Sequence, residues 1–246
     1  MASCDTTGEA ERTTTDFRCV QCGFPVKTLY IQYSPGNIRL VKCGNCKAVA
    51  DGYIECEVMI LILDLILHKP KAYRHVFYNM FSKETVNFEQ SLFWKLVLVY
   101  GMLDIYKMWV LSTNEKEYPM PVSFTSFLLE FGKMLTGATF GNLIFLCVLF
   151  CGTRKLLSVA TRFHGWKQML FVVVVSSYFK IFLLAMMVWE FPSSVILIID
   201  IFVLSSNTVA LKVITNSGIV RCLLVCALAH GMKFFASQNK AFVLQS

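Results

Sequence analysis

The stretch that decides the fold runs from residue 19 to residue 46, CVQCGFPVKTLYIQYSPGNIRLVKCGNC, and carries a Cys-x-x-Cys pair at each end. The pairs are Cys19 with Cys22 and Cys43 with Cys46, and twenty residues separate them. This spacing is typical of structural zinc sites, in which four thiolates surround one Zn²⁺ tetrahedrally. The sequence therefore predicts one structural Zn²⁺ bound by Cys19, Cys22, Cys43 and Cys46.

The residues between the two pairs favour a β-hairpin. Two β-prone runs, 29–33 and 38–42, flank the turn sequence Ser34-Pro35-Gly36-Asn37. A hairpin with a Cys-x-x-Cys at each base is a zinc ribbon. Gly23 and Gly44 are expected to let the backbone fold closely around the sulfur atoms, where a Cβ would obstruct it. A turn at Asp51-Gly52 predicts a third strand at 53–57.

The alternative interpretation of the four cysteines is a pair of redox-active Cys-x-x-Cys motifs instead of a zinc site. Such motifs open a helix in a thioredoxin-like unit, and the flanking residues here do not have that pattern. A RING-type double site is excluded because it needs twice as many ligands. Cys56 could compete as a ligand, but it has no second cysteine at the Cys-x-x-Cys spacing. The pairs Cys147/Cys151 and Cys222/Cys226 lie in apolar segments, where a free cysteine is expected to behave as a small hydrophobic residue.

Two short segments follow the predicted ribbon. Residues 58–67 are apolar apart from Asp64, but as a helix they reach only about 15 Å and cannot span a bilayer. Residues 71–81 have helical period, with one apolar stripe (Tyr73, Phe77, Met80, Phe81) and polar residues roughly opposite (Lys71, Arg74, His75, Ser82). This segment suits either the headgroup layer of a membrane or packing against the ribbon or the membrane helices. His68 and His75 are expected to be ordinary polar residues.

The composition is that of a membrane protein. Hydrophobic residues fill 56% of the 246 positions and charged residues only 16%, which excludes an ordinary soluble globule. The net charge is +7, but residues 1–90 hold ten basic and ten acidic residues, so the excess lies in the apolar remainder and indicates topology rather than nucleic-acid binding. Residues 1–18 are expected to be a disordered tail without a cleaved secretory signal. The paired cysteines are therefore expected in the reducing cytosol.

Five apolar segments approach the length of a spanning helix, and we predict a membrane domain over 84–246 with three to five transmembrane helices. The segments are 92–111, 134–151, 169–189, 195–211 and 213–235. The first is the weakest, because it contains Lys95, Asp104 and Lys107. The loop 152–167 carries four basic residues and no acid, which places it and the zinc-ribbon domain in the cytosol. Lys233 and Lys240 would then be lumenal, and these two basic residues are the one poor fit to the rule that basic residues concentrate on the cytoplasmic side.

Charged residues inside the apolar segments require partners, because an unpaired charge in hydrocarbon is costly. Lys180 and Asp200 lie at similar depth in consecutive segments and are the predicted pair. Asp104 lies in the same half of the bilayer, so we expect a polar cluster of Asp104, Lys180 and Asp200. A structural tie between helices is favoured over a proton or substrate path.

The N-terminal part also carries a family resemblance. Its residues Cys19-Val-Gln-Cys22, Cys43-Gly-Asn-Cys46, Asp51-Gly-Tyr53-Ile-Glu55 and Ile66-Leu-His-Lys-Pro-Lys-Ala-Tyr-Arg-His-Val-Phe-Tyr-Asn79 resemble the homology domain of the Arv family of endoplasmic reticulum lipid-homeostasis proteins. The resemblance covers about residues 19–81. It implies a resident of the endoplasmic reticulum membrane that acts in sterol trafficking and distribution, sphingolipid balance and the supply of glycosylphosphatidylinositol anchor precursors.

The fold expected from these features is a small β-rich zinc ribbon within a cytosolic domain, residues 19–83, followed by an all-α polytopic membrane domain. The sequence has no Gly-x-Ser-x-Gly, His-Glu-x-x-His or Walker-type motif, and a zinc with four thiolates has no position for water. We expect a non-enzymatic lipid-handling or scaffolding factor, with sterol, sphingolipid or glycolipid and proteins at the ribbon as partners, and no nucleic acid. The alternative is an accessory subunit or enzyme of lipid or glycosylphosphatidylinositol-precursor synthesis, with His164 or His230 near the bilayer surface.

Overall fold

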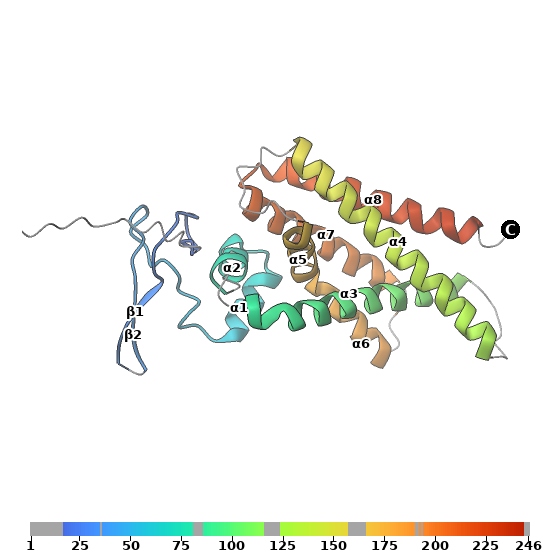
Figure 1. Ribbon diagram of the computed structural model, residues 1–246, viewed down its shortest axis with the longest axis horizontal. Coiled ribbons are helices and arrows are strands. Elements are labelled where there is room, and N and C mark those ends of the chain that lie inside the picture. Colours follow the sequence, from blue (N-terminus) through green and yellow to red (C-terminus); the bar gives the residue numbers. More distant parts are fainter. Residues whose placement is uncertain are drawn as a thin grey trace, which may run out of the picture.

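The computed structural model describes residues 17–34, 36–80, 86–115, 124–156, 166–189, 192 and 194–243. Figure 1 shows a small head at one end of an elongated helical body. We call residues 17–57 the head and the helices from residue 86 onward the helical body. Residues 1–16 of the predicted disordered tail lie outside the described residues. The described chain is mostly helical, and its two-stranded sheet lies beside the four paired cysteines.

The sheet of the head is the predicted hairpin. Strands β1 (Tyr30–Ser34) and β2 (Asn37–Leu40) are antiparallel, with Tyr30 opposite Leu40 and an irregular register between Gln32 and Ser34. The predicted third strand at 53–57 is wrong, because these residues form turns instead. The Asp51 carboxylate accepts a hydrogen bond from the Tyr53 backbone N–H at 3.0 Å, and such a side-chain contact to the second residue beyond favours a turn over a strand.

Three short helical pieces connect the head to the helical body: α1 (Val58–Ile66), α2 (Pro70–Arg74) and a π-helical turn (His75–Met80). Pro70 begins α2, where its missing N–H is not needed. The apolar residues Tyr73, Val76 and Phe77 are buried in a cluster with Val172 of α5 (Trp166–Ser176) and Ala210 of α7 (Ser194–Thr215). Of the two expectations for this segment, packing against the membrane helices is therefore the one observed. Met80 of the predicted stripe is 49% exposed, and Phe81 and Ser82 lie outside the described residues.

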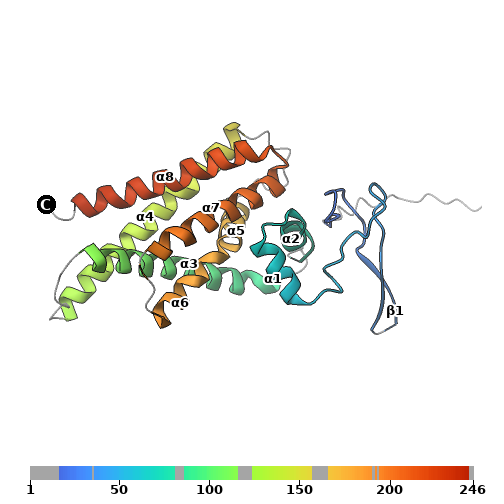
Figure 2. The ribbon, with the colours of Figure 1, turned by 180° about the vertical axis from the view of Figure 1, so that it is seen from behind.

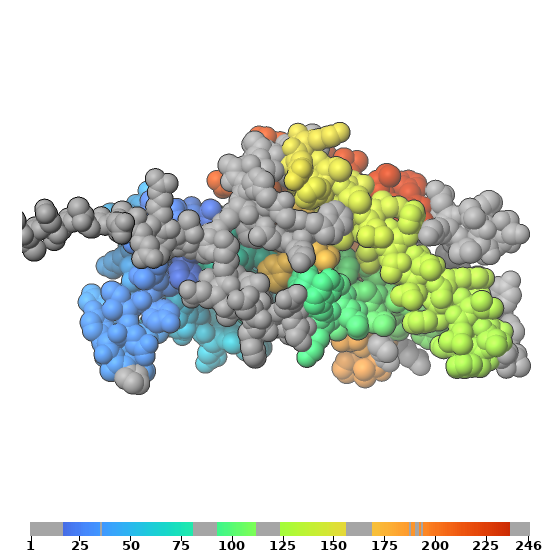
Figure 3. Space-filling view, viewed as in Figure 1, coloured from blue at the N-terminus to red at the C-terminus, as the bar shows by residue number. Residues whose placement is uncertain are grey.

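Most helices of the body are long and run along its length, and two shorter helices lie among them (Figures 1 and 2). The elements are α3 (Val86–Glu115), α4 (Phe124–Leu156), α5 (Trp166–Ser176), a 3₁₀ turn (Tyr178–Ile181), α6 (Phe182–Val188), α7 (Ser194–Thr215) and α8 (Ile219–Val243). The head lies at the end where α7 passes into α8, and the C-terminus lies at the opposite end. In the space-filling view the head extends beyond the helices (Figure 3).

Three helical stretches among the described residues are long and apolar enough to cross a membrane. They are Phe124–Lys155, Ser194–Thr215 and Ile219–Ala236. The stretches 169–176 and 178–186 are together long and apolar enough for a fourth span, but the chain bends by 47° at the break between them. The predicted segment 92–111 lies inside α3 but is not among these stretches, and it carries three charged residues. The chain is thus a multi-pass integral membrane protein.

Candidate metal centre

The two Cys-x-x-Cys pairs form matching turns at the base of the hairpin. In the first, the Gly23 N–H donates to the Cys19 carbonyl at 2.8 Å, and in the second the Lys47 N–H donates to the Cys43 carbonyl at 3.0 Å. The two residues at this position have φ of +79° and +62°. Gly23 is favoured here for a different reason from the one predicted: glycine adopts positive φ without a steric cost, whereas an added Cβ would meet only Arg74 Nε, at 3.7 Å. The prediction for Gly44 is wrong: a Cβ there would meet nothing within 4 Å, and Lys47 takes the left-handed position.

The sulfur atoms of these turns are arranged as a metal site requires. The four Sγ atoms all lie within 4.8 Å of one another, and Sγ–Sγ is 3.7 Å for both Cys19–Cys46 and Cys22–Cys43. A tetrahedral site with Zn–S bonds of about 2.3 Å has Sγ–Sγ separations of about 3.8 Å. Cys19 and Cys43 are buried, while Cys46 is partly exposed and Cys22 is exposed. The four cysteines are thus close enough to hold one metal ion.

The thiols differ in their readiness to become thiolates. Burial raises the pKa of the Cys19 thiol to about 12. Burial also acts against the Cys22 thiolate, but hydrogen bonds from the Phe24 backbone and the Asn45 side chain outweigh it and lower the pKa of Cys22 to about 7. A divalent cation among the four sulfur atoms would stabilise the thiolate of buried Cys19, so the donor set fits a cation better than it fits free thiols.

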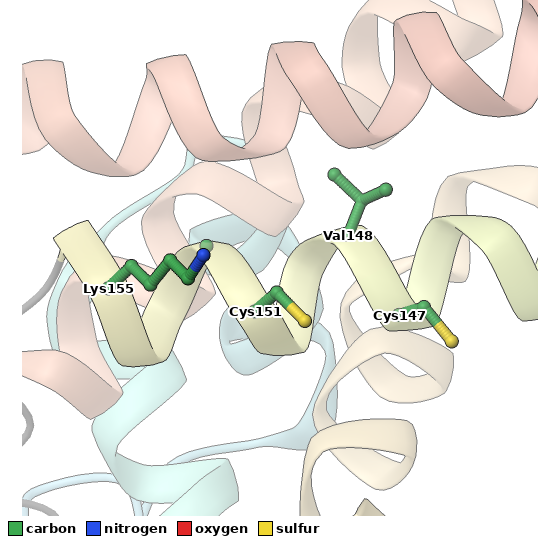
Figure 4. A pocket seen from close by; sticks show the side chains of 5 residues that line it. Cys147, Val148, Cys151 and Lys155 are labelled. Atoms are coloured by element: carbon green, nitrogen blue, oxygen red, sulfur yellow. The ribbon is translucent and has the colours of Figure 1, made fainter.

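The other described cysteines lie outside this cluster. Cys56, the competing ligand, is exposed and donates from Sγ to the Gly52 carbonyl at 3.2 Å. Cys222 and Cys226 belong to the buried core between α4 and α8, as expected of small hydrophobes. Cys147 and Cys151 instead lie exposed on α4 and line a shallow hollow of about 440 Å³ with Val148, Gly152 and Lys155 (Figure 4). Within the described chain, the four paired cysteines are the group placed to bind a metal.

A buried carboxylate joins the metal centre to the helices. Asp51 is fully buried, and its Oδ2 lies 2.6 Å from His75 Nδ1 and accepts a hydrogen bond of 2.6 Å from the Asn79 side chain. Asn79 also exchanges two hydrogen bonds of 2.9 Å with the backbone of Arg18, the residue before the first cysteine. Because a buried charge is stable only when paired, Asp51 holds the head to the π-helical turn.

Arg74 makes the second connection. Its Nη1 donates to the carbonyls of Val20 at 2.8 Å and Gln21 at 3.0 Å, the two residues between the first pair of cysteines. Arg74 and His75 of the predicted polar side therefore contact the head, not lipid headgroups. Sequence reasoning did not find this contact between Asp51, His75 and Asn79. The available signal was that all three residues lie in the stretches that carry the Arv resemblance.

The helical body contains a buried polar network, but its pairing differs from the prediction. Lys180 pairs with Asp104, with Nζ 2.6 Å from Oδ1, so the predicted Lys180–Asp200 pair is wrong. Lys233 Nζ lies 2.8 Å from the other oxygen of Asp104 and 2.7 Å from Asn142 Oδ1. Asp200 instead pairs with Lys107 of α3. The network thus joins α3, α4, α7, α8 and the 3₁₀ turn.

The 3₁₀ turn between α5 and α6 explains why the observed pair differs from the predicted one. The depth of a residue along its segment does not say in which direction its side chain points. The 3₁₀ turn directs the Lys180 side chain toward Asp104 and the Tyr100 ring, whose centroid is 3.6 Å from Nζ. Lys233, which is predicted to be lumenal, reaches into the bundle to Asp104. His230 also lies inside, against the Phe145 ring and 3.2 Å from Asn207, rather than near the bilayer surface. His164 lies outside the described residues.

Comparison with known proteins decides the family. The family model described as Arv1-like matches residues 18–211, which is most of the chain. The chain belongs to the Arv1-like family. Within this family it is 51% identical to Protein ARV 1 of Arabidopsis thaliana over 223 residues, covering 91% of this chain and 88% of that protein. It is 26% identical to Protein ARV1 of Homo sapiens over 209 residues, covering 81% of this chain and 73% of that protein.

The region that matches the Arv1-like family contains the four cysteines, the Asp51 contacts, and α3 to most of α7. The resemblance found in the first eighty residues therefore extends into the helical body. Protein ARV 2 of Arabidopsis thaliana is 49% identical over 220 residues, covering 89% of this chain and 93% of that protein. No solved structure matches the chain.

Proposed function

We propose that this chain is an endoplasmic reticulum membrane protein that maintains sterol distribution and regulates sphingolipid metabolism as a non-enzymatic lipid-handling or scaffolding factor. The observation that carries the proposal is the Arv1-like match over residues 18–211, since the family is broadly known for lipid homeostasis. The match includes the metal centre and most of the helical body, so the proposal concerns the chain as a whole.

The proposal assigns the metal centre a structural role as a zinc ribbon. A Zn²⁺ held by Cys19, Cys22, Cys43 and Cys46 would have all four positions filled by sulfur, which leaves none for a water or a substrate. Such an ion supplies folding free energy rather than chemistry. The residues that would transmit its effect to the membrane are Asp51 and Arg74, because Asp51 of the head contacts the π-helical turn and Arg74 of α2 contacts the first Cys-x-x-Cys turn.

The proposal also places the head in the cytosol. Arg154 and Lys155 end α4 at the same end of the body as the head, and Lys212 and Arg221 flank the α7–α8 connection there. Basic residues concentrate on the cytoplasmic side of membrane proteins. Protease treatment of sealed microsomes should therefore remove an N-terminal epitope and leave a C-terminal epitope protected, and the opposite pattern would contradict this orientation.

Two measurements test the function. Cells that lack their own Arv1-like protein should recover normal sterol distribution when they express this chain, and should not recover when they express Cys22→Ser. In vesicles that contain the purified chain, labelled sterol and glycolipid should move between membranes faster than in empty vesicles. Rescue without movement would favour scaffolding over lipid transfer.

The alternative, an enzyme or accessory subunit of lipid or glycosylphosphatidylinositol-precursor synthesis, makes a different prediction. Purified chain would then convert a lipid substrate to a chemically distinct product, or would do so once its partner subunit is added. Product analysis by mass spectrometry in the same vesicles distinguishes the two proposals, because lipid transfer and scaffolding leave every lipid chemically unchanged.

A further inference from the structure

Helix α1 has an unusual surface for a segment that follows a metal-binding head. None of its nine residues is buried, and all but Asp64 are apolar. The outward side chains of Val58, Met59 and Leu63 are 69%, 62% and 54% exposed. An apolar surface of this kind is costly in water, and large exposed patches mark contact with a membrane or another protein.

The inner side of α1 packs on α2, the π-helical turn and the membrane helices rather than on the hairpin, from which it is separated in Figure 2. Leu61 and Leu65 pack against the cluster that contains Val172 and Ala210, and Ile66 packs against the cluster of α6 and α7. The Leu65 carbonyl accepts a hydrogen bond of 2.6 Å from the Tyr178 hydroxyl in the 3₁₀ turn. The helix is thus attached to the part of the body where α5 and α6 meet.

The depth of this attachment follows from His68, which lies just after α1. Its Nε2 is 2.9 Å from Ser205 Oγ, and its ring stacks on Phe179 and Phe202. Ser205 is ten residues before the head-side end of α7 at Thr215, a distance of about 15 Å along a helix. The 22 residues of α7 are about as long as the hydrocarbon layer is thick, roughly 30 Å, so the head-side end of this span marks the edge of that layer. With α7 placed in this way, the C-terminal end of α1 would lie below that edge.

The single acidic residue of α1 is neutralised within the protein. Asp64 accepts hydrogen bonds of 2.7 Å from Lys69 Nζ and from the Tyr53 hydroxyl. Lys69 is half exposed, so its long stem can carry the ammonium group toward the headgroups. Pairing of this kind is what allows a charged residue to remain next to hydrocarbon.

We propose that α1 is a membrane-embedded helix that lies in the leaflet on the head side, with lipid acyl chains covering its outer face. The exposed face of α1 is continuous with the lipid-facing surface of α7, because His68 contacts Phe202, which is itself 41% exposed on that helix. A helix of this length occupies one leaflet only. Through Tyr53 and Asp51 it fixes the metal centre against the membrane surface.

Site-specific photo-crosslinking tests the proposal on the full chain. Benzoylphenylalanine is placed at Met59, at Leu197 of α7 or at Tyr33 of the hairpin, positions that are 62%, 66% and 64% exposed. The variants are reconstituted in phosphatidylcholine vesicles whose acyl chains carry tritium, and are then irradiated. We expect the variants with the crosslinker at Met59 and at Leu197 to carry a radioactive lipid adduct, and the variant with the crosslinker at Tyr33 to carry none.

Two outcomes would overturn the proposal. One is a Met59 variant as free of label as the Tyr33 variant, and the other is a Met59 adduct with a second copy of the chain instead of lipid. A second comparison, Met59→Asp with Ile31→Asp, does not depend on the crosslinker. In vesicles, Met59→Asp should lower the Tm and Ile31→Asp should not, and equal Tm values would contradict burial of α1 in lipid.

Discussion

The head and the helical body each contain a fully buried carboxylate, but the two regions keep their structure by different means. Around Asp51 the apolar core is small, formed by Cys19, Val26, Leu29, Cys43 and Ala50, and every residue of β1 is exposed. Around Asp104 the helices bury three apolar clusters and pair two lysines with one acid. We therefore expect the head to depend on a bound metal ion, and the body on packing and ion pairs.

The largest expected effect is the loss of the metal site. Cys43→Ser removes a buried ligand and should unfold the head, because a structural Zn²⁺ contributes on the order of 10 kcal/mol to folding. Hydrogen exchange in vesicles should show lost protection in residues 17–57 with α4 and α8 still protected. Cys56→Ser is the matched control, since this exposed thiol lies outside the cluster. Equal loss of protection in head and body would mean that they fold as one cooperative unit.

A smaller but still large effect is expected in the buried network of the body. Asp104→Ala leaves Lys180 and Lys233 without a counter-charge, and breaking a buried pair costs about 3 to 5 kcal/mol. The free energy of unfolding in mild detergent measures this loss. Asp200→Ala is the control with a smaller expected loss, because Asp200 and Lys107 both reach the surface of the bundle.

A double-mutant cycle sharpens the same comparison. The losses from Asp104→Ala and Lys180→Ala should be strongly non-additive, because the two side chains are in direct contact. The losses from Lys180→Ala and Asp200→Ala should add, since each has its own partner. If the losses in free energy of unfolding add for Asp104 and Lys180, or are coupled for Lys180 and Asp200, the result would favour the Lys180–Asp200 pair predicted from the sequence.

The contact between the head and the π-helical turn should respond to Asp51→Ala. This change leaves His75 and Asn79 without their buried acceptor, and we expect a loss of about 3 kcal/mol. Hydrogen exchange of residues 75–80 reports the loss, while metal content should stay at one ion per chain. Glu55→Ala, an exposed acid in the same loop, is the control. Loss of the metal in Asp51→Ala would mean that the carboxylate supports the ribbon itself.

The smallest effect concerns packing within the body. A Cβ added by Gly152→Ala would lie 2.8 Å from Val225 Cγ1, so α4 and α8 would have to move apart at a cost of about 1 to 3 kcal/mol. Gly101→Ala in α3 should not destabilise the protein, because nothing lies within 4 Å of its added Cβ. A fall in Tm for Gly152→Ala alone checks this expectation, and equal Tm values would contradict the close α4–α8 packing.

Local chemistry made the head predictable. The hairpin and the two Cys-x-x-Cys turns at its base depend on residues close together in the chain. The strand expected at 53–57 failed because the Asp51 side chain caps a turn there. The apolar length of α4, α7 and α8 was also readable, since it reflects only composition over a helical span.

Contacts between distant residues were not predictable in the same way. Nothing in the sequence near Lys180 says that a 3₁₀ turn directs it to Asp104, or that Lys233 reaches the same carboxylate from α8. The role of His75 and Asn79 likewise appears only when Asp51 is brought to the π-helical turn.

The sequence by itself determined that the chain has a four-cysteine site on a hairpin and several membrane helices, because ligand spacing and apolar length are properties of short segments. Only the tertiary structure decided which charges pair inside the bundle, which cysteines face outward, and that α1 lies against the membrane helices. These features depend on the rotation and tilt of packed helices, and on bends such as the one of 47° at the break between residues 169–176 and 178–186, which are set by contacts between distant parts of the chain.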